Sequence, residues 1–129
     1  MTKEKQKPDR ILVVDDEPHV CDILKKILEG ESYMCFTATS GVRALNFLKK
    51  ESIDLILLDV QMPRMGGIEF LQKVRQSDKS VAVIILTAHA TLGTAREAME
   101  LGAYDYITKP FDARFVISMV KEGLEEGGA

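Results

Sequence analysis

The pattern of apolar and polar residues alternates between two periods along most of this chain. Short runs rich in Val, Ile and Leu predict strands at Ile11–Val14, Met34–Ala38, Leu55–Leu58, Val81–Leu86 and Asp105–Ile107. Several runs are almost continuously apolar, which is typical of parallel strands that are covered on both faces. Longer segments with helical spacing fill the gaps between these runs.

The helical segments carry start and end signals. Pro18 suits the first turn of a helix that stops at Gly30, and its apolar stripe comprises Val20, Ile23, Leu24, Ile27 and Leu28. Ser40 is expected to cap a second helix, whose apolar side comprises Val42, Leu45 and Leu48. A third helix follows Gly66–Gly67, with inward positions at Ile68, Leu71 and Val74. Asp112 is expected to cap the last, whose core-facing residues are Phe115, Val116, Met119 and Val120.

The fourth helical segment, near Leu92 to Leu101, differs from the others in the size of its inward residues. Its core-facing positions, Ala95 and Ala98, are small. An alanine in place of a leucine-sized contact forfeits about 1–2 kcal/mol of burial. We therefore expect this helix to be the least stable one.

Five βα units in strict alternation predict an α/β fold with a doubly wound parallel sheet, right-handed crossovers and helices on both faces. The expected strand order is the flavodoxin-like 2-1-3-4-5, which is a common order for such sheets and is not dictated by this pattern. We expect one domain over residues 10–124, a flexible leader over 1–9 and a flexible tail or linker start over 125–129. Glu122 to Ala129 are interpreted as a helix end that frays.

Composition narrows the class of protein. The 129 residues are 46% hydrophobic and 29% charged, and the net charge of −3 argues against direct binding to nucleic acid or anionic lipid. Cys21 and Cys35 have no metal-binding spacing and are interpreted as reduced packing residues. The start of the chain lacks the apolar core of a signal peptide, and the run Ile53 to Val60 is too short to span a bilayer. We therefore expect a cytoplasmic protein.

Polar residues follow the predicted strands where each of them ends. Asp15–Asp16 follow the first strand, Asp59 the third, Thr87 the fourth and Lys109–Pro110 the fifth. In doubly wound sheets, ligands bind beyond the carboxyl ends of the strands, at the point where the strand order reverses. With the first and third strands adjacent, three carboxylates meet there beside a hydroxyl and an ammonium group.

Three neighbouring carboxylates are costly unless a positive charge joins them. Two charges about 5 Å apart repel by roughly 3 kcal/mol at an effective dielectric constant of about 20. Lys109 can offset one charge, and an all-oxygen site with few carboxylates suits Mg²⁺. A carboxylate beside Mg²⁺, Lys and a hydroxyl group is equipped to accept a phosphoryl group as a nucleophile.

Four sequence blocks carry a family resemblance. The segments ILVVDDEP, DLILLDVQMPRMGG, VIILTAHA and GAYDYITKPF resemble the receiver domains of bacterial response regulators, in order and with matching spacing, from about Arg10 to about Leu124. The block from Leu86 to Phe111 most resembles receivers of transcriptional activators. The resemblance implies a phosphoacceptor switch in two-component phosphorelay signalling, not an enzyme acting on other substrates.

The resemblance also implies a role for each matching residue. Asp59 accepts the phosphoryl group from a sensor histidine kinase or a phosphotransfer protein. Mg²⁺, for which Mn²⁺ is expected to substitute, is held by Asp16 and Asp59 directly, by Asp15 through water and by the backbone carbonyl of Gln61. The phosphoryl oxygens are held by Thr87 and Lys109. Tyr106 is the aromatic switch that follows Thr87, and the Lys109–Pro110 peptide bond is cis. The face formed by the fourth helix, fifth strand and fifth helix then changes.

Several interpretations stay open. Gln61 and His89 are expected to border the phosphoryl group and to tune its hydrolysis, although His89 also suits an ordinary loop position, and Tyr106 suits a half-buried strand position. An aspartate-nucleophile phosphatase is the rival function, but the acidic pair here is adjacent and no cap insertion is present. The chain is either a stand-alone regulator or the receiver part of a longer protein with an output domain. A partner or a second copy, in a phosphorylation-dependent homodimer, is expected to read the altered face.

Overall fold

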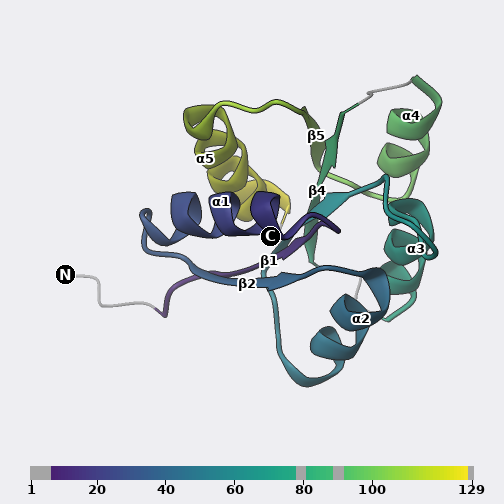
Figure 1. The fold of residues 1–129 in the computed structure, drawn as a ribbon, viewed down its shortest axis with the longest axis horizontal. Coiled ribbons are helices and arrows are strands. Elements are labelled where there is room, and N and C mark those ends of the chain that lie inside the picture. The colour runs from purple at the N-terminus through teal and green to yellow at the C-terminus, as the bar shows by residue number, and fades with distance from the viewer. Residues whose placement is uncertain (1–6, 78–80, 89–91, 128–129) are drawn as a thin grey trace.

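The fold is a parallel sheet between two layers of helices (Figure 1). A computed structural model describes residues 7–77, 81–88 and 92–127. Its strands have the order β2-β1-β3-β4-β5, all neighbours are parallel, and the predicted topology is thereby confirmed. The strand bounds are β1 Arg10–Val14, β2 Met34–Ala38, β3 Leu55–Asp59, β4 Ala82–Thr87 and β5 Asp105–Thr108.

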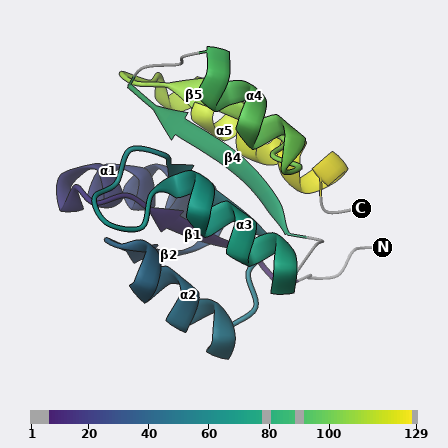
Figure 2. The same cartoon turned by 90° about the vertical axis from the view of Figure 1, so that its right-hand side faces the viewer.

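The helices divide between the two faces of the sheet. Their bounds are α1 Pro18–Glu29, α2 Gly41–Lys50, α3 Gly67–Ser77, α4 Leu92–Glu100 and α5 Ala113–Glu122. Helices α1 and α5 pack on one face, and α2, α3 and α4 pack on the other, which faces the viewer in Figure 2. Among the described residues, no helix has the length and apolar character needed to cross a membrane.

The central strands are buried on both faces, which explains their continuous apolar runs. Leu55 and Leu57 of β3 belong to the core under α1 and α5, while Ile56 and Leu58 belong to the core under α2, α3 and α4. All four side chains have no exposed surface. Side chains of successive strand residues point to opposite faces, so a strand covered on both sides needs apolar residues at every position.

The predicted helix caps are present. Pro18 is the first residue of α1, and Gly30 follows its last turn. The Ser40 hydroxyl accepts a hydrogen bond from the backbone N–H of Arg43 at 3.1 Å, and Asp112 Oδ1 accepts one from Arg114 at 2.8 Å. These side chains satisfy backbone donors that the first turn of a helix leaves without partners.

Three residues predicted to face the core are instead exposed. Phe115 is 50% exposed, Val42 is 56% exposed and Ile23 is 37% exposed. Each lies at the margin of its helix's apolar stripe, where the helix surface curves away from the flat sheet. The sequence prediction for these side chains was therefore wrong, because the stripe is wider than the area that the sheet covers.

The C-terminal helical segment is longer than predicted. A π-helical turn, η1 (Gly123–Gly127), continues α5 beyond Glu122. Gly123 is buried, and a Cβ atom there would lie 3.0 Å from Leu55 Cδ1, so its missing side chain lets the turn approach the sheet closely. Leu124 packs against the α1–α5 core. Helical structure therefore continues past Glu122 to Gly127, and the flexibility expected for residues 125–129 stays a prediction.

The C-terminal end of helix α4 is bound to α3. Ala98 is its only buried side chain among those that the structure describes in this helix. The Ala95 side chain lies outside the described part. The Arg75 guanidinium of α3 donates to three backbone carbonyls just beyond α4 and before β4, those of Leu101 at 2.8 Å, Gly102 at 2.9 Å and Val81 at 2.7 Å. Arg75 therefore fixes this end of α4 to α3 and to the start of β4.

The close approach of α3 to the end of β3 gives a testable prediction. A Cβ atom on Gly67 would overlap Val60 Cα and lie 2.8 Å from the Asp59 carbonyl oxygen, and both of these are backbone atoms. We expect Gly67→Ala to lower the free energy of unfolding by about 2–4 kcal/mol in denaturant titrations. The matched control is Gly93→Ala in α4, where a Cβ atom meets nothing within 4 Å. The control should leave stability unchanged or raise it by up to about 1 kcal/mol. Equal stability of the two variants would contradict this account of Gly67.

Candidate functional site

Three carboxylates converge at the carboxyl ends of β1 and β3. Asp15 and Asp16 follow β1, and Asp59 ends β3, which pairs directly with β1 in a register that sets Val14 beside Leu58. One oxygen atom from each carboxylate lies within 4.8 Å of the other two. Asp15 and Asp59 are buried, and Asp16 is half-buried. The predicted cluster is therefore assembled by the pairing of two neighbouring strands.

Backbone groups hold the two buried carboxylates in place. Asp15 Oδ1 accepts a hydrogen bond from the N–H of Glu17, and Asp59 Oδ1 accepts one from the N–H of Gln61, both at 3.0 Å. The Cys21 thiol lies 3.3 Å from the Asp15 carbonyl oxygen, to which it donates. None of these three contacts was predicted from the sequence. An Asp that precedes a loop commonly bonds the N–H two residues later, so the first two contacts had a detectable signal.

Lys109, which follows β5, contacts both buried carboxylates, those of Asp15 and Asp59. Its Nζ donates to Asp15 Oδ2 at 2.8 Å and lies 3.7 Å from Asp59 Oδ2. The backbone N–H of Lys109 donates to the carbonyl of Thr87 at 2.8 Å, which ties the residue after β5 to the end of β4. The Lys109–Pro110 peptide bond is cis, as predicted.

The charges of the cluster do not balance. Burial raises the pKa of the Asp59 carboxyl, and the charges of Asp15 and Asp16 raise it further, against the opposing effects of the Gln61 N–H and of Lys109. Burial alone would lower the pKa of Lys109, but its hydrogen bond to Asp15 and the charges of Asp59 and Asp15 outweigh burial and raise it. The single ammonium stays protonated among three carboxylates, and the site carries excess negative charge.

The remaining predicted site residues differ in their exposure to solvent. Thr87 ends β4 and is 3% exposed, at the same edge of the sheet. Gln61 follows β3 with an exposed side chain. Tyr106 lies on β5 and is 40% exposed. His89 lies outside the described residues.

The residues present fit a divalent cation. Their donors are carboxylate oxygens, which are the atoms that Mg²⁺ prefers, and the excess negative charge would be offset by such an ion. Among the described residues, every buried side-chain nitrogen or oxygen has a hydrogen-bond partner, so hydrogen bonds within the protein orient the two buried carboxylates. The arrangement can bind a cation and present an ionised carboxylate, Asp59, to an electrophile.

Comparisons with known proteins identify relatives along nearly the whole chain. Residues 11–121 match the family described as the response regulator receiver domain. The sporulation initiation phosphotransferase F of Bacillus subtilis is 39% identical over 116 residues, which cover 90% of this chain and 94% of that protein. The transcriptional regulatory protein ZraR of Klebsiella oxytoca is 41% identical over 102 residues, which cover 79% of this chain and 23% of that protein.

Solved structures share the same fold. A CheY-like receiver domain protein from Methanospirillum hungatei superposes with a TM-score of 0.89 at 33% identity, over 93% of this chain and 96% of that one. The chemotaxis protein CheY4 of Vibrio cholerae gives a TM-score of 0.86 at 28% identity, over 90% and 98% of the two chains. The chain thus belongs to the response regulator receiver domains, the phosphoacceptor domains of two-component signalling.

Proposed function

We propose that this domain accepts a phosphoryl group on Asp59 from a histidine kinase or phosphotransfer protein. One observation supports this most strongly. A buried carboxylate at the end of β3 shares its site with two further carboxylates and with Lys109 Nζ, which lies 3.7 Å from Asp59 Oδ2. The ionised Asp59 needs no general base. Its oxygen forms a bond to phosphorus as the bond between phosphorus and the donor histidine nitrogen breaks.

We propose Mg²⁺ as the resident cation, with Mn²⁺ as a substitute. Asp16 and Asp59 would ligate it directly, Asp15 through water, and Gln61 through its backbone carbonyl. When bound, Mg²⁺ supplies positive charge against the oxygens of the transferring group. Lys109 supplies a second positive charge from the protein itself, and the hydroxyl of Thr87, a buried residue at the same edge of the sheet, would bind a phosphoryl oxygen.

We further propose that the domain catalyses only its own phosphorylation and dephosphorylation. Gln61 and His89 would border the phosphoryl group and set its rate of hydrolysis, and an unchanged dephosphorylation rate after replacement of either side chain would contradict their role. A phosphatase with an aspartate nucleophile is not favoured, because the family is a signalling one and the acidic pair follows β1 while Asp59 ends β3.

Partners beyond the phosphodonor are also proposals. The chain spans 94% of the Bacillus phosphotransferase but only 23% of the ZraR regulator. Either a stand-alone regulator or a receiver followed by an output domain is consistent with these two lengths. A cytoplasmic location follows from the proposed kinase, and a second copy of the chain is a candidate reader of the phosphorylated face.

The proposed switch runs from Thr87 through Tyr106 to α4. Tyr106 is exposed in this structure, and its ring would turn inward once Thr87 moves toward a phosphoryl group. Because Arg75 holds the backbone at the C-terminal end of α4, we assign the proposed shift to the N-terminal end of this helix. Only a phosphoryl group that contacts the two states differently can move this equilibrium.

The phosphoacceptor proposal is tested by the intact mass of the protein after incubation with Mg²⁺ and a small-molecule phosphodonor. We expect one phosphoryl adduct on the wild type and none on Asp59→Asn. Chelation of Mg²⁺ beforehand should abolish the adduct. Asp54→Asn is the matched control, because this exposed residue lies on the opposite edge of the sheet and should leave the adduct unchanged. An adduct of equal yield on Asp59→Asn would refute the assignment.

The excess negative charge predicts a pH-dependent stability effect. The folded protein raises the pKa of Asp59, so ionisation of this group destabilises the fold once the pH exceeds its unfolded value of about 4. Without divalent cations at neutral pH, Asp59→Asn should therefore raise the melting temperature by about 3–5 °C, as should Asp16→Asn by removing a like charge. The gain of Asp59→Asn should vanish below about pH 4. A fall in melting temperature for both variants would show that hydrogen bonds already satisfy each carboxylate.

The switch proposal predicts a change in the dynamics of α4. Hydrogen exchange of its amides should be the fastest among the helices and should change when a phosphoryl analogue such as beryllofluoride is added with Mg²⁺. Thr87→Ala should retain the analogue and lose the change in α4. Arg75→Gln should speed exchange in both states, because three hydrogen bonds are lost. Identical exchange in α4 with and without the analogue would rule out this relay.

A further inference from the structure

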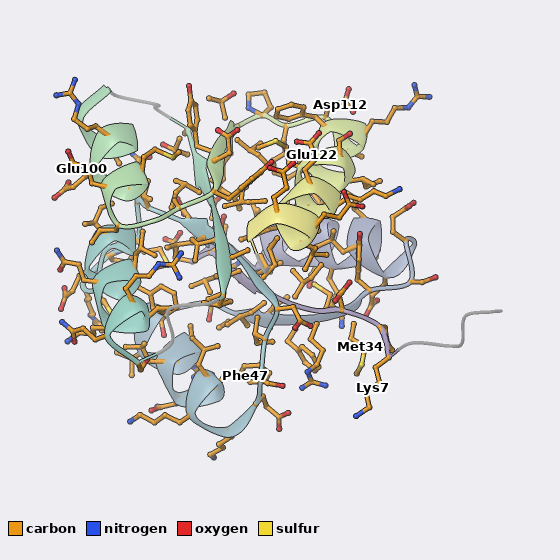
Figure 3. The ribbon with its side chains drawn as sticks, turned by 180° about the vertical axis from the view of Figure 1, so that it is seen from behind. Lys7, Met34, Phe47, Glu100, Asp112 and Glu122 are labelled. Atoms are coloured by element: carbon orange, nitrogen blue, oxygen red, sulfur yellow. The ribbon has the colours of Figure 1, made fainter. Side chains whose placement is uncertain are left out.

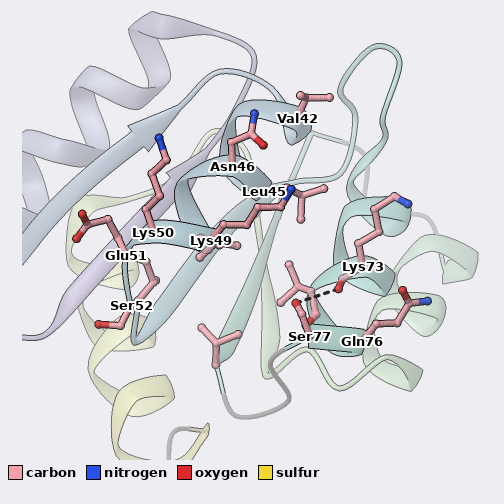
Figure 4. A pocket seen from close by; sticks show the side chains of 14 residues that line it. Val42, Leu45, Asn46, Lys49, Lys50, Glu51, Ser52, Lys73, Gln76 and Ser77 are labelled. Atoms are coloured by element: carbon pink, nitrogen blue, oxygen red, sulfur yellow. Dashed lines mark hydrogen bonds between the residues drawn. The ribbon is translucent and has the colours of Figure 1, made fainter.

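A second concave surface lies far from the acidic cluster, between α2 and α3 (Figure 4). This α2–α3 groove has a volume of about 880 Å³. It is bounded by α2, by the segment that leads into β3, by the C-terminal half of α3 and by the start of β4. The phosphoacceptor site lies at the other edge of the sheet, so the proposed function does not use this groove.

The floor of the α2–α3 groove is apolar, and most of the residues around it are polar or charged. Ile53, Val74 and Val81 form a buried floor, with exposures of 8%, 1% and 4%. Leu45 of α2 is only half-buried, and Val42 of the same helix is 56% exposed. Val42 is therefore a large, exposed apolar side chain at the entrance of the α2–α3 groove, above an apolar floor.

The rim of the groove is cationic in a domain whose net charge is −3. Lys49 and Lys50 come from the last turn of α2, and Lys73 comes from α3. Among the described residues, none of these three ammonium groups forms an ion pair. Glu51, the acidic residue that the structure places in the lining, is paired with Arg10 at 2.7 Å.

Complementation of a helix dipole explains the lysines at the end of α2, but it does not explain Lys73. Lysines at the C-terminal end of α2 complement the dipole of that helix. Lys73 lies in the middle of α3 and has no such role. Positive charge on both walls, with no described anion to neutralise it, complements a ligand that carries carboxylates on its flanks.

The shape of the groove favours a helical peptide. Helix α2 has 10 residues and is about 15 Å long, which matches two to three turns of a bound helix. An amphipathic helix places its apolar face in such a groove and its charged flanks against the rim. The lining contains no aromatic residue among those described, so stacking of nucleic-acid bases has no platform there.

We propose that the α2–α3 groove is a docking site for an acidic amphipathic helix of a partner protein. The apolar face of that helix contacts Val42 and Leu45, and its carboxylates pair with Lys49 and Lys73. Docking is independent of the chemistry at Asp59, so Asp59→Asn binds the partner helix as the wild type does.

The test uses the full chain and a labelled synthetic helix of about 14 residues, with leucines on one face and glutamates on both flanks. We expect saturable binding that weakens with salt, and backbone NMR shifts confined to α2, α3 and the start of β4. Val42→Glu and the double variant Lys49→Glu/Lys73→Glu should each weaken binding by about tenfold or more. Both changes are at the surface, so folding should be retained.

Matched controls lie on the opposite face of the sheet. Ile23→Glu replaces an apolar residue of α1 that is 37% exposed, and Lys121→Glu reverses an exposed charge on α5. Both controls and Asp59→Asn should bind the peptide as the wild type does. The proposal is overturned if the peptide does not bind or if the shifts map elsewhere. It is also overturned if a lysine-flanked peptide or a single-stranded oligonucleotide binds as tightly as the acidic peptide.

Discussion

Electrostatic repulsion among Asp15, Asp16 and Asp59 is the constraint on which the site depends. Strands β1 and β3 are adjacent and end at the same edge, so three carboxylates come within 4.8 Å of one another. Lys109 offsets part of their charge from the end of β5, at 2.8 Å from Asp15 and 3.7 Å from Asp59. The remaining negative charge favours a divalent cation, which would in turn offset the negative charge of an incoming phosphoryl group. A cluster with balanced charges would destabilise the fold less and would bind a cation more weakly.

The two hydrophobic cores provide the stability that this arrangement requires. The central strands are buried on both faces, and α1 with α5 and α2 with α3 cover them. The acidic residues lie at the rim of this rigid frame, where backbone N–H groups of Glu17 and Gln61 orient them. Among the side chains of α4 that the structure describes, only that of Ala98 is buried, and Arg75 binds the backbone carbonyl just beyond the C-terminal end of this helix. Rigid positioning of the charges and weak attachment of one helix are the two properties that a phosphorylation switch needs.

The sequence predicted the strands and the cluster well, because each depends on a strong local signal, whereas the strand order was expected only as the common order for such sheets. Two-sided burial makes the runs at Leu55–Leu58 and Ile11–Val14 continuously apolar, and the charged residues that interrupt such runs mark the strand ends. Features that depend on the packing angle between a helix and the sheet could not be predicted from the sequence. Whether Phe115 or Val42 meets the sheet depends on how each helix is rotated upon it, which residue spacing does not specify. Arg75 donates hydrogen bonds to backbone carbonyls of distant segments. Every residue has such a carbonyl, so the order of side chains in the sequence does not indicate which ones are bound.

We infer that unbalanced negative charge at the ends of β1 and β3 creates the cation site. Calorimetric titration of Mg²⁺ into the wild type, Asp16→Asn and Lys109→Met would test this inference. We expect Asp16→Asn to weaken Mg²⁺ binding by about tenfold or more, because a ligand and a negative charge are both lost. We expect Lys109→Met to bind Mg²⁺ at least as tightly as the wild type, because a competing positive charge is removed. Wild-type affinity in Asp16→Asn, or weaker binding in a folded Lys109→Met, would contradict it.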